Sequence, residues 1–177
     1  FDNGTSEGSP ILSRAVAGLL KGMPESTLIF APHFNSYRRL RPDTHAPTLA
    51  SWGYENRTTA IRIPGGNHAS RRIEHRVAGA DANPYLVIAA ILGAALYGIE
   101  NELAPPDPVR GRAYSERLPK LPADWASAVN AFEDGEIIPA FFDEALRSMF
   151  VACKRQEIDG FASNVTDFEF AAYLEII

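Results

Sequence analysis

Hydrophobic and polar positions near the start of the chain predict a helix followed by a shorter one. Apolar residues recur there at helical spacing, namely Ile11, Ala15, Leu19 and Leu20. Ser9 and Pro10 precede them as a typical N-cap and first helical residue, so we expect this helix to run to about residue 22. Pro24 is expected to open a second short helix or turn, which Pro32 ends.

The middle of the chain has the alternation that is typical of strands. Residues 52–64 are predicted to form one strand, in which two isoleucines share one face and Arg62 lies on the other. The sequence Pro-Gly-Gly-Asn at 64–67 is a strong turn signal. A second strand is expected at 71–77, with three charged residues on one face: Arg72, Glu74 and Arg76. The glycine-rich connection between two such strands predicts antiparallel neighbours that line a groove.

The second half of the chain is predicted to be helical. Asn83 and Pro84 form another N-cap and first-residue pair, and residues 85–102 are apolar on nearly every side, so this helix should be central and buried. Prolines end it, and an exposed loop that contains arginine continues to Pro122. Three amphipathic helices are expected in the tail, at 124–133, 143–157 and 166–175. The predicted fold is therefore α+β, an antiparallel sheet packed by helices, and 177 residues suffice for a single core.

Charge is distributed unevenly along the chain. Residues 33–77 contain eight of the 14 arginines and all four histidines, but only three of the 22 acidic residues. This stretch therefore has a formal charge of +5 in a chain whose net charge is −5. A buried guanidinium needs a partner, and the local carboxylates are few, so the excess indicates anionic ligands. Phosphate and carboxylate are the anions that a planar guanidinium binds best.

Composition narrows the class of protein further. After Gly98, 15 acidic residues face seven basic ones, which argues against a protein that wraps nucleic acid. The longest apolar run, residues 85–98, is shorter than the roughly 20 residues of a bilayer-spanning helix, so we expect no membrane association. The single cysteine, Cys153, suits a reducing compartment such as the cytoplasm, where we expect the protein to reside.

Glu74, between Arg72 and Arg76, is the most informative polar position. These side chains either form a simple ion-pair ladder on a strand, or Glu74 binds a hard divalent cation while Arg76 clamps a substrate carboxylate. One carboxylate cannot hold such an ion alone. Arg57 and Arg62, beside the same groove, either pair with distant acids or hold an oligophosphate, where they would offset charge on a transferred phosphoryl group.

Four motifs occur in order along the chain: NSYRRL, ASWGYENRTTAIRIP, RRIEHR and GADANPYL. Together they resemble the C-terminal catalytic half of the glutamine synthetase family over residues 33–103. The tail, which contains FFDEALRSMFVACKRQEIDGF, is similar to the branch of γ-glutamylpolyamine synthetases. The resemblance implies an ATP-dependent ligation in two steps, in which the side-chain carboxylate of glutamate is phosphorylated and an amine then displaces phosphate.

The resemblance also implies roles for individual residues. Arg39 would hold the substrate and acyl-phosphate side of the site, and Arg57 and Arg62 would contact the phosphates of ATP. Glu74 would bind Mg²⁺ or Mn²⁺, and Arg76 would bind the α-carboxylate of glutamate. The resemblance further implies a homo-oligomer, the double ring of the family, for the full-length protein.

One position departs from the family pattern. The family carries a glutamate six residues after the NSYRRL-type arginine, where it helps to take a proton from ammonium, and here that position is His45. A neutral imidazole can act as a base near pH 7, but it attracts ammonium less than a carboxylate does. His45 is therefore a candidate catalytic residue beside Arg39, and a larger amine such as a polyamine is expected in place of ammonia.

The resemblance places residues 1–177 in the C-terminal part of a larger catalytic domain. The small N-terminal β-domain and the other metal ligands of the family would lie upstream of Phe1, so the chain by itself is expected to be inactive. Two alternatives remain open for the whole protein. One is a catalytically inactive synthetase-like binding protein, and the other is a structural or interaction module built on the arginine cluster.

Overall fold

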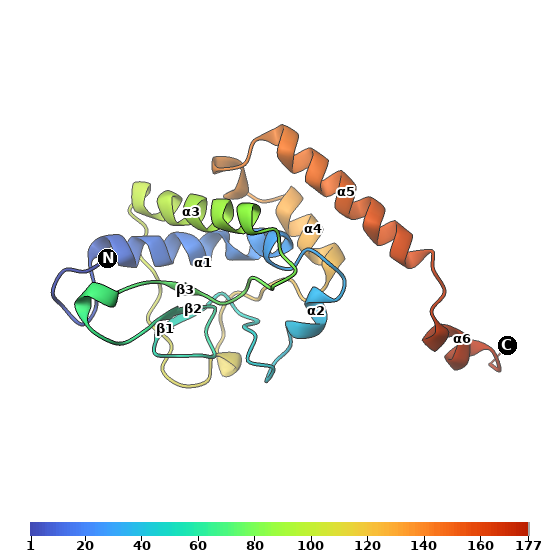
Figure 1. Cartoon of the computed structure of the whole chain (residues 1–177), viewed down its shortest axis with the longest axis horizontal. Helices are drawn as coiled ribbons and strands as arrows, with labels where there is room; N and C mark the ends of the chain where they lie inside the picture. The colour runs from blue at the N-terminus through green and yellow to red at the C-terminus, as the bar shows by residue number, and fades with distance from the viewer. Residues whose placement is uncertain (177) are drawn as a thin grey trace.

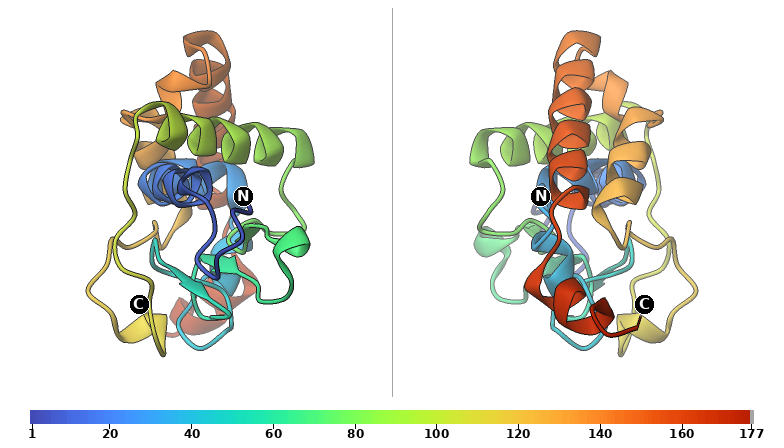
Figure 2. Two further views of the ribbon diagram at one scale, coloured as in Figure 1. Left: turned by 90° about the vertical axis from the view of Figure 1, so that its left-hand side faces the viewer. Right: turned by 90° about the vertical axis from the view of Figure 1, so that its right-hand side faces the viewer.

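The computed structural model describes residues 1–176 and consists of helices packed against a small sheet (Figure 1). α1 (Pro10–Phe30) and α3 (Pro84–Glu100) lie side by side, and the strands lie on the side of α1 that faces away from α3 (Figures 1 and 2). α4 (Trp125–Glu133) packs on α1, and α5 (Glu144–Ala162) packs on α4. The predicted α+β fold class is confirmed.

α1 is one continuous helix, so the expectation that it ends near residue 22 and restarts at Pro24 is wrong. The Ser9 hydroxyl accepts a hydrogen bond from the Leu12 amide (3.2 Å), as predicted for an N-cap. Pro24 removes one backbone hydrogen bond, but the helix is buried on both sides of this residue. Tertiary packing of this kind, more than local propensity, decides whether a helix continues.

The sheet contains three short strands in the order β1 (Trp52–Tyr54), β2 (Ile61–Ile63) and β3 (Glu74–His75). β2 and β3 are antiparallel, as predicted, with Arg62 opposite Glu74. The prediction of a single strand over 52–64 is wrong, because β1 and β2 are separate strands that pair in parallel. The second predicted strand, 71–77, is present only as the two residues of β3.

A tight loop interrupts the chain between β1 and β2. Glu55 adopts a left-handed conformation (φ 50°), and the Asn56 side chain accepts hydrogen bonds from the amide and the hydroxyl of Thr58 (3.0 and 2.7 Å). Such local side-chain bonds compete with a continuous strand and favour a turn. The chain then re-enters the sheet beside β1, which makes the sheet mixed in direction.

The core lies between α1, α4 and one face of the sheet. Its largest fully buried side chains include Leu12, Met23, Phe30, Ile61, Ile63 and Phe132. Because Ile61 and Ile63 point into this core, Arg62 between them faces the opposite side of the sheet. The predicted alternation of β2 is therefore confirmed, and it is what presents an arginine on the face away from the helices.

α3 begins as predicted, with the Asn83 side chain accepting the amides of Tyr85 and Leu86. The expectation that α3 would be buried all round is wrong. The face toward α1 is buried, at Ala90, Ala94 and Gly98, while the opposite stripe is exposed: Tyr85, Ile88, Leu92 and Leu96. The apolar residues surround the helix, but within residues 1–176 only one side has a packing partner. Among these helices, none combines the length and apolar character that a membrane crossing demands.

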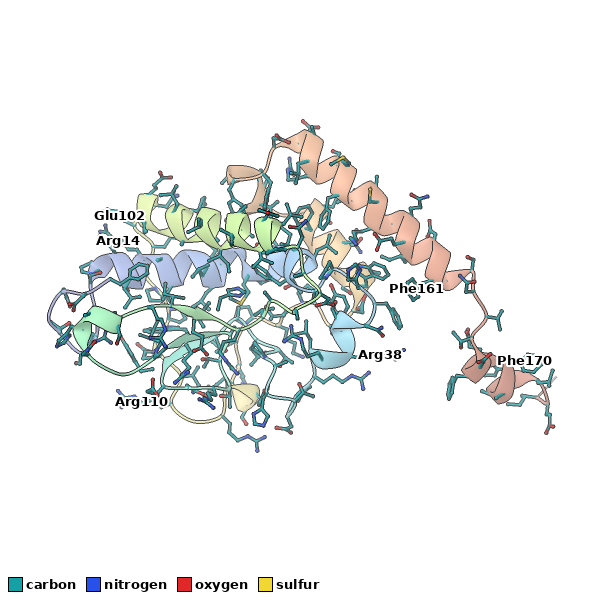
Figure 3. The ribbon with its side chains drawn as sticks, in the orientation of Figure 1. Arg14, Arg38, Glu102, Arg110, Phe161 and Phe170 are labelled. Atoms are coloured by element: carbon teal, nitrogen blue, oxygen red, sulfur yellow. The ribbon has the colours of Figure 1, made fainter. Side chains whose placement is uncertain are left out.

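The three helices expected in the tail are confirmed as α4, α5 and α6 (Asp167–Tyr173). Each begins at an N-cap whose side chain accepts a backbone amide: Asp124, Asp143 and Thr166, the last within a capping box. α5 continues past residue 157 to Ala162, and its end and α6 project from the body of the molecule (Figure 1). Phe170, labelled in Figure 3, is an exposed residue of this projecting end.

Candidate functional site

Arginine and carboxylate side chains form a connected cluster on the face of the sheet that points away from α1. Arg62 of β2 pairs with Glu74 of β3 (3.0 Å) and with Glu55 (3.1 Å). Arg76 Nε lies 3.4 Å from the second carboxylate oxygen of Glu74. Both arginine side chains are largely buried, while the carboxylates of Glu74 and Glu55 are 35% and 57% exposed, so solvent screens these pairs, most of all the one with Glu55. The prediction that local acids are too few for the arginines is thus wrong for Arg62 and Arg76.

Glu55 was not among the predicted site residues, yet it is an integral part of this cluster. It accepts a hydrogen bond from the Gly65 amide, which lowers the pKa of its carboxyl, and the bond from Arg62 lowers this pKa further. In return, the hydrogen bond with Glu55 raises the pKa of Arg62. Each partner of the Glu55–Arg62 pair therefore favours the charged form of the other. The sequence feature that could have indicated this role is the position of Glu55 directly after β1, because the turn that follows places its side chain beside Arg62 of β2.

Arg76 connects the cluster to two loops. Its guanidinium donates to the carbonyls of Arg57 and of Thr59 (3.1 Å for the latter) and to the carbonyl of His45 (3.3 Å). Arg57 and His45 thus join the cluster through their backbones, while the His45 side chain is exposed. A guanidinium has five N–H groups in a planar fork, so one can bridge several acceptors from separate segments.

Arg39 lies at the end of β3 that leads to α3. It donates to the carbonyl of Val77, the residue after Arg76. Partial burial lowers the pKa of Arg39, and the nearby carboxylate of Asp81 opposes this shift. Asp81 in turn accepts a hydrogen bond from the Ser36 hydroxyl (2.6 Å), which ties α2 (Ser36–Arg39) to the chain before α3. The NSYRRL and GADANPYL motifs are therefore neighbours in space.

A hollow of about 1260 Å³ lies beside this cluster, between the N-terminal loop, the start of α1, β1 and the residues near 110. Its charged lining residues are Glu7, Glu55, Arg57 and Arg110. Tyr54 lines it as well and donates its hydroxyl hydrogen bond to the Glu7 carbonyl (2.9 Å). Arg110, which Figure 3 labels, was not predicted as a site residue. Its loop reaches the hollow only through long-range pairing that no local pattern indicates.

The segment after α3, residues 104–122, runs along the arginine-rich stretch and is called the strap below. The Val109 amide donates to the Trp52 carbonyl (2.9 Å), the Ala113 amide to the Thr58 hydroxyl (2.9 Å) and the Leu121 amide to the Thr48 carbonyl (3.0 Å). The loop predicted here as merely exposed is thus bonded along much of its length to residues 48–58. The strap therefore holds the loops that carry the cluster.

The structure brings the six predicted site residues into one neighbourhood. Arg62, Glu74 and Arg76 meet through their side chains, Arg57 and His45 through backbone carbonyls, and Arg39 beside the end of β3. Their assigned roles stay predictions. Within residues 1–176 no three His, Cys, Asp or Glu side chains are grouped so that they could hold a metal ion. Both carboxylate oxygens of Glu74 face arginines, and its role as a metal ligand stays a prediction.

Comparisons with known proteins agree with this geometry. The family model of the glutamine synthetase catalytic domain matches residues 1–173. The chain is 40% identical over 163 residues to gamma-glutamylputrescine synthetase of Escherichia coli (strain K12), which covers 92% of this chain and 34% of that protein. It is 36% identical over 176 residues to gamma-glutamylethanolamide synthetase of Streptomyces coelicolor, which covers 98% of this chain and 38% of that protein.

The fold is similar to solved structures as well. Ligand-free GmaS superposes with a TM-score of 0.85 at 31% sequence identity, over 99% of this chain and 41% of that one. The chain thus spans between a third and about two fifths of the length of the relatives it matches. The match extends from the first residue through α6, and so includes every element that builds the arginine cluster. The chain therefore belongs to the glutamine synthetase family and represents part of its catalytic domain.

Proposed function

We propose that the whole protein is an ATP-dependent carboxylate–amine ligase that joins the side-chain carboxyl of glutamate to a primary amine larger than ammonia. The observation that carries the proposal is the cluster in which Arg62 and Arg76 flank Glu74, with Arg39 at the end of the same strand. Two guanidiniums at one carboxylate, with a third at the end of the same strand, suit a site for phosphate, a second carboxylate and a divalent ion. The ADP complex of the related GmaS also supports nucleotide binding.

The reaction needs two transfers, and the residues of the cluster can assist both. In the first, a carboxylate oxygen of glutamate attacks the terminal phosphorus of ATP and the bond to ADP breaks. Arg57 and Arg62 would stabilise the negative charge on the phosphates in this step. In the second, the amine nitrogen attacks the acyl carbon, phosphate leaves, and the amine loses a proton to a base. Arg39 would hold the acyl-phosphate oxygens as the charge passes to the departing phosphate.

Glu74 would supply one oxygen ligand to Mg²⁺ or Mn²⁺, and the ion, when bound, neutralises charge on the phosphates. Arg76 has three of its N–H groups engaged with backbone carbonyls and a fourth near Glu74. It therefore retains limited capacity for the α-carboxylate of glutamate. Its larger contribution is to hold the loops of His45 and Arg57 in place through its bonds to their backbone carbonyls.

The choice of amine is the finer part of the proposal. His45 is exposed on its loop and presents an imidazole instead of a carboxylate, which weakens any preference for a small ammonium ion. Relatives named for putrescine, ethanolamide and isopropylamine products or substrates support an organic amine. A catalytically inactive synthetase-like protein is the remaining candidate, and it differs in showing nucleotide binding without turnover.

The test is a screen of the full-length protein with ATP, Mg²⁺, glutamate and a panel of ammonia, putrescine, ethanolamine and isopropylamine. ADP release and the γ-glutamyl amide, identified by mass spectrometry, should both depend on an organic amine and should be lower with ammonia. Residues 1–177 alone should release no ADP above background. ATP binding without amide formation from any amine would contradict the proposal and favour the inactive binding protein.

Replacing Glu74 with glutamine should lower kcat/KM by at least about 100-fold, because the substitution removes a metal-ligand charge and leaves Arg62 and Arg76 facing a neutral group. The effect should be accompanied by a higher requirement for Mg²⁺. Steady-state kinetics at varied Mg²⁺ measures both. Glu55→Gln is the matched control: it removes the other carboxylate partner of Arg62, but that side chain is 57% exposed, and a loss below about 10-fold is expected. Equal losses in the two variants would contradict the assignment of Glu74.

A further inference from the structure

The loop that carries His45 contains two residues with left-handed backbone angles, Asp43 (φ 64°) and His45 (φ 61°). Asp and His adopt this region more readily than most residues other than glycine, but it still costs free energy that surrounding contacts can offset. Within the loop, the Thr44 hydroxyl lies 2.7 Å from the carbonyls of Arg39 and Arg41. At the end of the loop the local contact is a long one, in which the Ala46 amide donates to the Thr44 hydroxyl (3.4 Å).

Two further contacts reach the loop from the strap. The Tyr114 hydroxyl donates to the carbonyl of Ala46 (3.1 Å), the residue directly after His45. Arg112 pairs with Asp43 at the other side of the loop. Together with the bond from Arg76 to the His45 carbonyl, these contacts hold positions 43, 45 and 46 of the left-handed turn.

The two strap contacts differ in how much they can restrain the loop. The side chains of Arg112 and Asp43 are 67% and 68% exposed, and ion pairs at such exposure contribute little. Tyr114 is partly buried, and burial raises the pKa of its hydroxyl, so the group remains a hydrogen-bond donor well above neutral pH. Its neighbours are anchored too, since the Ala113 amide donates to Thr58 and the Ala50 amide to the Pro119 carbonyl (2.9 and 2.8 Å).

We infer that Tyr114 is a positioning residue for the amine-accepting step: through the Ala46 carbonyl it fixes the loop that places His45 beside the cluster formed by Arg62, Glu74 and Arg76. The inference rests on the proposed function, because the loop matters to catalysis only if His45 meets the amine. Tyr114 contacts neither the phosphate-facing arginines nor Glu74 through its hydroxyl. Loss of this hydroxyl should therefore affect the amine more than ATP or glutamate.

The experiment compares Tyr114→Phe with wild type in the full-length protein, which removes the hydroxyl and keeps the ring. Hydrogen–deuterium exchange of a peptide covering 41–47 should become about fivefold faster, the size expected for losing one hydrogen bond. The KM for the preferred amine should rise about fivefold, while the KM values for ATP and glutamate stay within twofold. Tyr97→Phe on α3 is the matched control, since it removes a hydroxyl from an aromatic ring that instead packs near Lys21. Arg112→Gln should behave like the control.

Each outcome decides between the parts of the inference. Unchanged exchange over 41–47 in Tyr114→Phe overturns the anchoring of the loop, whether or not the enzyme is active. Faster exchange with an unchanged amine KM, or with equal rises in the KM for ATP and for amine, overturns the assignment to the amine-accepting step. Faster exchange in a protein that ligates no amine at all identifies the proposed function, and not the anchoring, as the part that fails.

Discussion

Replacing Gly18 with alanine is expected to destabilise the protein by about 3 kcal/mol, because α1 and α3 touch at this point backbone to backbone. A Cβ atom on Gly18 would lie 2.1 Å from the Ala94 carbonyl oxygen and 2.6 Å from the Gly98 nitrogen. The reciprocal contact is as close, since a Cβ on Gly98 would lie 2.2 Å from the Arg14 carbonyl oxygen. Backbone atoms of a helix cannot rotate away, so the two helices would have to separate.

The magnitude follows from two opposing effects. Alanine is favoured over glycine inside a helix by about 1 kcal/mol, which acts to stabilise α1. Overpacking a tight core costs about 1–3 kcal/mol and more when no side chain can yield. Separation of α1 and α3 would also expose apolar area along the buried faces of both helices, including Leu19 and Ala90. The steric term is therefore expected to exceed the gain in helix propensity by a clear margin.

Urea denaturation of the full-length protein measures this effect. Gly160→Ala in α5 provides the matched control, because a Cβ there meets nothing within 4 Å and only the gain in helix propensity remains, up to about 1 kcal/mol of stabilisation. In Gly22→Ala, one turn further along α1, the added Cβ would lie 3.4 Å from its nearest neighbours. The stability of this variant is expected to lie between those of Gly18→Ala and Gly160→Ala. A Gly18→Ala protein as stable as wild type would show that α1 and α3 are not in backbone contact.

The features that sequence predicted well are those with local causes. The N-caps Ser9 and Asn83 each form the predicted bond to an amide two or three residues ahead. The alternation of Ile61, Arg62 and Ile63 decided which face of the sheet presents charge. Helix caps and strand alternation involve only near neighbours in the chain, so a single sequence contains the necessary information.

The features that sequence missed depend on distant partners. A helix that is apolar all round, such as α3, predicts burial, but only the geometry of the fold determines how many of its faces are covered. Likewise, Pro24 predicts a break, and only packing on both sides of it keeps α1 continuous. The strap looked like an exposed loop because its hydrogen bonds join residues about 55 to 70 positions apart.

The candidate site shows the same division. The excess of arginine and the spacing of Glu74 and Arg76 were sufficient to locate the cluster. The partner of Arg62 across the turn, Glu55, and the bonds of Arg76 to backbone carbonyls could not be predicted, because both depend on the loop between β1 and β2. The charge argument also overestimated the number of free guanidiniums, because Arg62 pairs with two of the few local acids, Glu55 and Glu74.

Acidification from pH 6.5 to pH 4 is expected to cost about 3 kcal/mol of stability through one residue, His75. Its side chain points from β3 into the core, on the opposite side from Glu74, and its ring centroid lies 4.4 Å from that of Phe30. Neither ring nitrogen has a hydrogen-bond partner among residues 1–176. Burial lowers the pKa of His75 from 6.5 to about 4, because a charged imidazolium is poorly solvated in this environment.

The sign follows from proton binding in the two states. Below pH 6.5 the unfolded chain takes up a proton on this histidine, while the folded protein does not until the pH approaches 4. The unfolded state thus binds more protons throughout this window, so stability falls as the pH falls and levels off, for this residue, below 4. Each pH unit within the window corresponds to about 1.4 kcal/mol, which gives the total of about 3 kcal/mol.

Denaturation curves of wild type and His75→Phe at several pH values between 7 and 4 test this prediction. Phenylalanine does not titrate and packs on Phe30 in the same way, so the difference between the two proteins isolates the histidine. Carboxyls with lowered pKa values, such as those of Glu55, Asp124 and Glu169, also reduce stability at acid pH, but they do so equally in both proteins. Between pH 7 and pH 4, the free energy of unfolding of His75→Phe should therefore fall by about 3 kcal/mol less than that of wild type. Parallel curves would mean that His75 finds an acceptor in solution and that β3 is more open than this packing implies.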